Sequence, residues 1–139
     1  MKKKPLILTP YQSMTEGIAV TVLPAFLAHE SNPLDHKYVW GYSIRIRNTR
    51  DHSVQLVDRH WIIFDGNGRK EEVRGSGVLG DQPIIKPGTH YDYKSGVPLG
   101  TPSGMMQGRY RFTTTDGAEF WVDIPAFSLD SEHETRNHH

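Results

Sequence analysis

Hydrophobic and polar positions alternate along several short segments of the chain. In residues 38–48 an aromatic or aliphatic side chain stands at every second position: Tyr38, Trp40, Tyr42, Ile44 and Ile46. Gly, Ser and Arg occupy most of the positions between them. A period of two residues is typical of an antiparallel strand that buries one face. Residues 38–48 are therefore predicted to form such a strand, with the apolar set facing the core.

The same pattern recurs in four further segments, residues 17–27, 53–65, 84–96 and 108–129. These segments are rich in Val, Ile, Thr, Tyr, Phe and Trp, the residues that favour strands. Pro24 has no backbone N–H to donate to a neighbouring strand, so we expect an edge position or a bulge there. Strict alternation fails near Asp58 and Arg59, which predicts a second bulge.

Turn signals separate these segments. Asp65–Gly68 reads DGNG, and the pairs Pro87-Gly88 and Asp116-Gly117 also lie between apolar runs. Such residues accept positive φ or preset a turn, and they close hairpins. Because no segment shows a helical period, the sequence predicts an all-β domain, an antiparallel β-sandwich of about seven or more strands.

The length of 139 residues fits one domain. We expect the sandwich to span residues 14–130, preceded by a flexible basic segment at 1–13. Residues 131–139 are polar and without pattern, which predicts a disordered tail. Its terminal pair, His138 and His139, is either native or the remnant of a purification tag.

Charge and cysteine content narrow the function classes. Sixteen Lys and Arg residues balance sixteen Asp and Glu residues, so no global field favours DNA or an anionic membrane. The chain has no cysteine, which excludes disulfides, thiolate metal sites and cysteine nucleophiles. The apolar run at residues 6–8 is too short for a signal peptide, and no membrane span is expected. These features favour a cytoplasmic location.

A glycine loop, residues 75–80, carries Gly75, Gly77 and Gly80 in the spacing G-x-G-x-x-G. A dinucleotide site needs a helix directly after these glycines, but Pro83 and two isoleucines follow here, so a Rossmann site is rejected. A Walker loop is rejected as well, because Asp and Gln follow Gly80 in place of Lys and Ser or Thr.

Two interpretations of the glycine loop remain. In the first, the glycines let the segment that connects two strands turn sharply and pack close to a neighbouring strand. In the second, backbone amides of the loop form an anion-binding nest, with Arg74 adding a positive charge and Ser76 lying between the glycines. The second interpretation makes Arg74, Gly75, Ser76, Gly77 and Gly80 the candidate ligand-binding residues.

Metal ligands and stacking platforms are the other candidates. Asp58 with His60, and His90 with Asp92, each place two ligand types on one face of a strand. The alternative is that these histidines hydrogen-bond to neighbours. Of the three tryptophans, Trp40, Trp61 and Trp121, we expect core packing for Trp40, whereas Trp121 is the better candidate for a surface position.

No activated nucleophile is recognisable in the sequence. Ser76 lies in GSGVLG, which lacks the G-x-S-x-G elbow and its strand-to-helix turn. We therefore expect a protein that is not an enzyme and that carries no cofactor.

Four segments together resemble the ApaG family. They are YVWGYSIRIRN, VQLVDRHWIIFDGNG, EVRGSGVLGDQPIIKPG and YRFTTTDGAEFWVDIPAFSL. The resemblance covers about residues 14 to 130 and is far more specific than the glycine spacing alone. It implies an immunoglobulin-like, fibronectin type III-like sandwich.

The resemblance also carries functional expectations. It implies a bacterial context associated with cobalt and magnesium resistance or efflux. Related domains in eukaryotic F-box proteins and in a polymerase-interacting protein are thought to mediate protein interactions. Nucleotide or pyrophosphate binding has been proposed for the loop that matches Gly75, Gly77 and Gly80.

The function expected from the sequence is thus a binding module that engages an unknown protein partner through strand faces or edges, with a homodimer as one form of it. The alternative is a phosphate-ligand sensor that holds pyrophosphate or a nucleotide on the glycine loop. Direct binding of a divalent metal is the third hypothesis.

Overall fold

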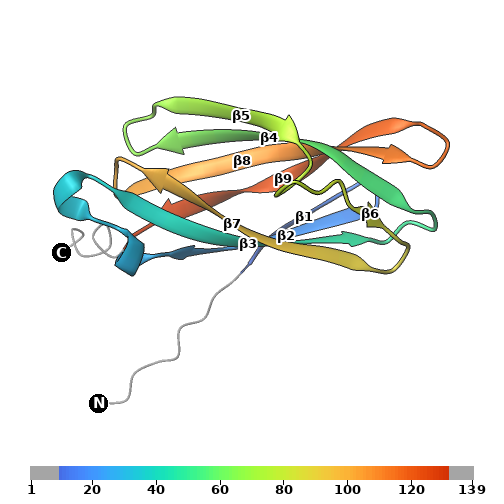
Figure 1. Ribbon diagram of the computed structural model, residues 1–139, viewed down its shortest axis with the longest axis horizontal. Helices are drawn as coiled ribbons and strands as arrows, with labels where there is room; N and C mark the ends of the chain where they lie inside the picture. The colour runs from blue at the N-terminus through green and yellow to red at the C-terminus, as the bar shows by residue number, and fades with distance from the viewer. Residues whose placement is uncertain (1–9, 132–139) are drawn as a thin grey trace, which may run out of the picture.

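The computed structural model describes residues 10–131, and within them nine strands form two antiparallel sheets stacked face to face (Figure 1). The first sheet has the order β1-β2-β3-β7: β1 (Tyr11–Thr15), β2 (Ile18–Phe26), β3 (Tyr38–Asn48) and β7 (His90–Leu99). The second has the order β5-β4-β8-β9: β5 (Lys70–Ser76), β4 (Val54–Asp65), β8 (Ser103–Thr114) and β9 (Glu119–Asp130). The short strand β6 (Ile84–Ile85) pairs with β4, and two 3-10 turns, η1 (Ala28–Glu30) and η2 (Pro33–Asp35), join β2 to β3. The predicted all-β sandwich is confirmed.

The core lies between the two sheets, where the alternating apolar positions meet. Every inward residue predicted for β3 is buried, from Tyr38 to Ile46, as are Ile18, Val20 and Val22 of β2. The facing layer supplies Leu56, Tyr110, Phe112 and Val122. A pleated strand exposes opposite faces at successive residues, so this alternation fixes the register of each pairing.

The predicted irregularities and turns are confirmed. The register of β4 against β8 shifts between Leu56 and Asp58, which is the expected bulge. Pro24 lies beyond Val22, the last residue of β2 that pairs with β1, so it has an edge on that side. The Asp65–Gly68 and Asp116-Gly117 turns close the β4–β5 and β8–β9 hairpins.

Ordered residues extend beyond the expected bounds of the sandwich at both ends. β1 begins at Tyr11, and Tyr11 pairs with Val22 and packs against Phe127. Ser131, assigned to the tail, is buried. The segment YQSMT has too few apolar residues to signal a strand, although its pairing with β2 orders it. Residues 1–9 and 132–139, including the terminal histidines, lie outside the described part of the chain.

The two long sides of the sandwich differ. On one side, β1 and β9 are joined by hydrogen bonds: Ser13 Oγ donates to Asp123 O at 3.0 Å, and Asp123 N donates to Thr15 Oγ1 at 3.2 Å. On the other side lie the edge strands β5 and β7 (Figure 1). No hydrogen bond or ion pair between β5 and β7 is found in residues 10–131. The sandwich is therefore closed along β1–β9 and open along β5–β7.

Within residues 10–131, no helix has the length and apolar character that a membrane crossing requires.

Candidate functional site

A tight turn forms the tip of the glycine loop. Val78 N donates to Asp81 O, and Asp81 N donates to Val78 O, both at 2.8 Å. The two residues between them have positive φ, 48° at Leu79 and 83° at Gly80. Positive φ at both central positions is the signature of a type I′ turn, which joins two antiparallel residues directly. Leu79 consequently lies at the tip, with 62% of its surface exposed.

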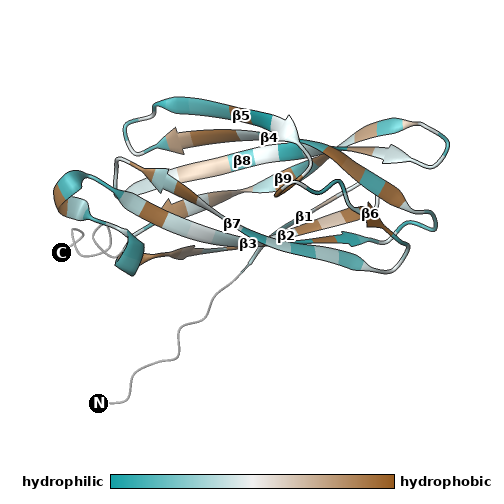
Figure 2. Ribbon diagram, viewed as in Figure 1, coloured by the Kyte–Doolittle hydropathy of each residue, from teal (hydrophilic) through white to brown (hydrophobic). Residues whose placement is uncertain are grey.

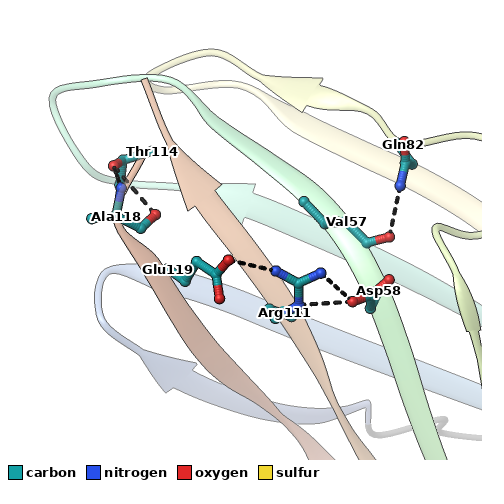
Figure 3. Close-up of polar contacts among 7 residues, drawn as sticks. All are labelled: Val57, Asp58, Gln82, Arg111, Thr114, Ala118 and Glu119. Carbon is teal, nitrogen blue, oxygen red and sulfur yellow. Dashed lines mark hydrogen bonds and ion pairs between the residues drawn. The ribbon is translucent and has the colours of Figure 1, made fainter. Parts of the chain in front are cut away.

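The bulge in β4 fastens the glycine loop to the sheet. The carbonyl oxygen of Val57, the bulged residue, accepts a bond from Gly77 N at 2.7 Å and another from Gln82 Nε2 at 3.0 Å. Figure 3 shows the Gln82 amide pointing at this carbonyl. A bulge leaves a backbone carbonyl outside the ladder. Here that carbonyl binds Gly77 within the loop and Gln82 just after it.

A close backbone contact requires glycine at position 77, whereas Gly75 packs against the movable end of a side chain. A Cβ at Gly77 would lie 2.0 Å from Asp81 O, and Gly77 has a φ of 57°. A Cβ at Gly75 would lie 2.8 Å from both Nη atoms of Arg59. The structure thus supports the first interpretation of the loop, in which glycines allow close packing. The strand β6 follows the loop, as the absence of a helix signal predicts.

The anion-binding residues are only partly available. The amides of Gly77 and Val78 already donate to carbonyl oxygens. Arg74 is exposed and lies 3.9 Å from Glu72 Oε2, whereas Ser76 is exposed and its carbonyl accepts a bond from Arg59. Anion binding at this loop stays a prediction.

Arg59 is a candidate site residue that sequence reasoning missed. Its Nη1 donates to Ser76 O at 3.0 Å and to Gly77 O at 2.9 Å. In the sequence, the only notable feature of Arg59 is that it stands two residues before Trp61. The bulge resets the alternation of β4, so that Arg59 lines the same cavity as Trp61 and Ile63.

That cavity, called the groove here, has a volume of about 520 Å³ and lies between β4–β5 and β3–β7. Such a volume is within the usual range of ligand sites, about 300–1,000 Å³. Apolar side chains cover its walls, chiefly Trp61, Ile63, Val73, Val97 and Met106. Polar groups line it as well: Arg59, Glu71, Ser95 and the phenols of Tyr42 and Tyr93.

Tyr42 and Tyr93 line the groove, and Tyr110 is fully buried in the core. The hydroxyls of Tyr93 and Tyr110 share a hydrogen bond. Burial raises the pKa of both tyrosines well above the usual value, and the charge of Arg59 offsets only a small part of this. Burial also raises the pKa of Tyr42, against a hydrogen bond from Ser95 and the charge of Arg59. These hydroxyls are neutral near pH 7, so the charge at this end of the groove comes from Arg59.

In the first predicted metal pair, Asp58 is already engaged by an arginine, whereas His60 is not. Asp58 accepts hydrogen bonds from Nε and Nη2 of Arg111, whose Nη1 lies 2.9 Å from Glu119 Oε2 (Figure 3). His60 is buried; its Nε2 has no hydrogen-bond partner among residues 10–131 and lies 3.7 Å from Glu72 Oε1.

The second pair is adjacent as well. His90 Nε2 lies 3.7 Å from Asp92 Oδ2. Arg45 holds both oxygens of Asp92 at 2.9 Å, and these hydrogen bonds lower the pKa of that carboxyl. Among residues 10–131 no group of three or more His, Asp or Glu side chains is arranged to hold a metal ion. Direct metal binding stays a prediction.

The tryptophan predictions are confirmed. Trp40 is buried in the core and donates from Nε1 to Asp130 O at 2.8 Å. Trp121 is 40% exposed, and the Arg109 guanidinium lies 4.3 Å from its ring centre.

Comparison with known proteins gives one consistent family. Residues 28–114 match the family described as DUF525, the ApaG domain. The chain is 51% identical over 126 residues to "Protein ApaG" of Brucella suis biovar 1, covering 91% of this chain and 97% of that protein. It is also 51% identical over 124 residues to "Protein ApaG" of Paramagnetospirillum magneticum, covering 89% and 95%.

Solved structures agree with this match. The crystal structure of the putative ApaA protein from Bordetella pertussis superposes with a TM-score of 0.81 at 42% identity, covering 90% of this chain and 98% of that one. The C-terminal domain of wzt, at 12% identity and a TM-score of 0.52, shares the fold alone. The sandwich, its glycine loop and these relatives together show that the chain belongs to the ApaG domain family.

Proposed function

We propose that this protein is a non-catalytic binding module that engages a partner protein through the open β5–β7 side of its sandwich. The observation that carries the proposal is the difference between the two sides. Side chains and backbone seal β1 to β9, whereas the groove separates β5 from β7. A concave apolar surface bordered by two unpaired strand edges suits an extended segment of another chain.

The polar character of β5 makes this recognition selective. β5 is largely hydrophilic (Figure 2), with Lys70, Glu71, Glu72 and Arg74 along its length. Charged edge strands resist indiscriminate pairing with other sheets. A partner must therefore gain its affinity from apolar side chains placed in the groove.

A non-catalytic role is supported by Tyr93, which lines the groove, and by its fully buried hydrogen-bond partner Tyr110. The phenols of Tyr93 and Tyr110 have raised pKa values and are held in a hydrogen bond, which makes them poor nucleophiles and poor bases near pH 7. In this proposal the protein works in the cytoplasm. Its partner, and not a metal ion bound by this chain, accounts for the family's association with cobalt and magnesium resistance. The immunoglobulin-like, fibronectin type III-like architecture proposed for the sandwich suits a binding module of this kind.

The phosphate-ligand alternative has less support. Two of the loop amides it needs are bonded to Val57 and Asp81, and Arg74 faces Glu72. A thermal-shift measurement with pyrophosphate, comparing the unmodified protein with Arg74→Ala, tests that alternative separately.

Site-specific photo-crosslinking in cells tests the proposal. A benzoylphenylalanine is placed at Leu79 or at Pro98, two exposed positions that line the groove from different elements. The matched control position is Met14, which is 61% exposed on β1. Both groove positions are expected to capture the same protein, identified by mass spectrometry, and Met14 is expected not to capture it.

An adduct with a second copy of the chain would identify the partner as the protein itself. Equal capture of one protein from all three positions, or no adduct from either groove position, would contradict the proposal.

A further inference from the structure

Arg59 lines the groove, and its guanidinium has unused donors. Both hydrogen bonds that it makes come from Nη1, to Ser76 O and Gly77 O. Nε and Nη2 make no hydrogen bond, and no Asp or Glu side chain forms an ion pair with Arg59, within residues 10–131. Arginine always carries its charge at physiological pH, so this end of the groove presents a fixed cation.

The same protein shows what Nε and Nη2 of an arginine bind. Arg45 donates from Nε and Nη2 to the two oxygens of Asp92, each at 2.9 Å. Arg111 uses the same two nitrogens on Asp58. A carboxylate matches this fork, and such paired bonds are among the stronger polar contacts in proteins. The chemistry that completes Arg59 is therefore a carboxylate.

The opposite end of the groove has the opposite charge. Arg59 is paired with Gly75 and Ile63 with Glu71, so Glu71 lies four residues from the Arg59 level along β5. Four residues of strand correspond to roughly 13 Å. Glu71 is exposed and lines the groove. Between the two charged ends the lining includes the apolar side chains of Trp61, Val73 and Val97.

We propose that the groove recognises the C-terminal end of a partner chain, with the terminal carboxylate on Arg59, an apolar last side chain in the groove, and a basic residue near Glu71. The inference rests on the proposed function and adds the chemistry of the partner. An extended chain of about four residues spans the distance from Arg59 to Glu71. A free apolar acid would satisfy Arg59 but would leave Glu71 without a counter-charge, so a peptide terminus is the better fit.

Peptides with and without a terminal carboxylate test the inference. The probe is a pool of acetylated pentapeptides that begin with lysine and end with leucine, valine, isoleucine, methionine or phenylalanine. It is compared with the same pool amidated at the C-terminus, and with a pool whose lysine is replaced by glutamate. Binding to the full chain is followed by amide chemical shifts in NMR.

The carboxylate pool is expected to shift amides of β5, β7 and the glycine loop, and to bind at least tenfold more tightly than the amidated pool. Replacing lysine with glutamate is expected to weaken binding, because Glu71 then faces a like charge. In Arg59→Gln the carboxylate and amidated pools are expected to bind alike. Arg109→Gln, on the outer surface beside Trp121, is the matched control and is expected to keep the preference.

If Arg59→Gln loses its NMR dispersion, Arg59→Lys replaces it, and a reduced preference is expected because an ammonium cannot form the paired bonds. Equal binding of amidated and carboxylate pools would overturn this inference and leave the photo-crosslinking result standing. The absence of groove shifts with every pool would overturn it too.

Discussion

The side chain of Asn48 is fully buried at the end of β3, and both the nitrogen and the oxygen of its amide form hydrogen bonds. Nδ2 donates to His52 O and Ile85 O, both at 2.9 Å, and Oδ1 accepts from Arg50 N at 2.8 Å. One residue thus joins the β3–β4 connection to β6. The run NTRDH at residues 48–52 is typical of a turn, but it gives no sign of the buried amide, because Asn is also common in exposed turns.

Asn48→Ala is expected to lower the free energy of unfolding by about 2–3 kcal/mol, since two carbonyls and one amide lose their partner inside the protein. Urea denaturation measures the change. Asn67→Ala, in the exposed β4–β5 turn, is the control and should stay within about 0.5 kcal/mol of the unmodified protein. Equal stability of Asn48→Ala and Asn67→Ala would show that the Asn48 bonds do not stabilise the fold.

The buried tyrosines predict a loss of stability at alkaline pH. Burial raises the pKa of Tyr93 and Tyr110 above the value of about 10 expected in the unfolded chain. Their contribution is complete below pH 10. As the pH rises further, the unfolded chain releases protons that the native state keeps, so stability falls by about 1.4 kcal/mol per pH unit for each such group.

Urea denaturation at pH 9 and pH 11 checks this. Stability is expected to drop between the two values, and the drop should be smaller in the double variant Tyr93→Phe, Tyr110→Phe. An unchanged drop in that variant would assign the effect to other groups.

At the scale of elements, the β4 bulge and the glycine loop form one unit. The sequence predicts the bulge near Asp58 and the sharp turning of the glycines, and both are confirmed. It cannot show that Val57 O fastens the loop, or that the bulge turns Arg59 into the groove. Both facts depend on contacts between strands far apart in the chain, which local alternation does not encode.

Two glycine substitutions in this unit are expected to differ in severity. Gly77→Ala places a Cβ against Asp81 O at a positive φ, so the turn must move, at a cost of more than about 2 kcal/mol. Gly80→Ala meets no atom within 4 Å and adds only the strain of its positive φ, about 1 kcal/mol. Thermal unfolding of both variants measures the order, and an equal loss in the two would contradict the close contact at Gly77.

At the scale of the whole molecule, the sandwich is sealed along one side and open along the other. The sequence predicts the two layers and the inward side chains of β3, because period-two alternation reports directly on burial. It does not predict which side is sealed. Ser13 and Thr15 look like ordinary surface residues in the sequence. They join β1 to β9 only because the fold places them opposite the backbone of Asp123.

The groove escapes sequence analysis for the same reason. Its walls come from strands of both sheets, and its volume depends on how far β5 stands from β7. Trp61, Val73 and Val97 read as core residues, since apolar side chains that line a cavity and those that fill a core have the same composition.

The measurement that tests the central claim most directly is partner capture after the groove has been filled. Val73→Trp adds an indole to the groove from the edge strand β5, and capture is read from the photo-crosslinker at Leu79. Thr115→Trp, on the exposed β8–β9 hairpin, is the control, and melting temperatures verify that both variants fold. The account predicts that Val73→Trp stays folded and loses the adduct while Thr115→Trp keeps it. A folded Val73→Trp that captures the partner at the level of the control would contradict the account.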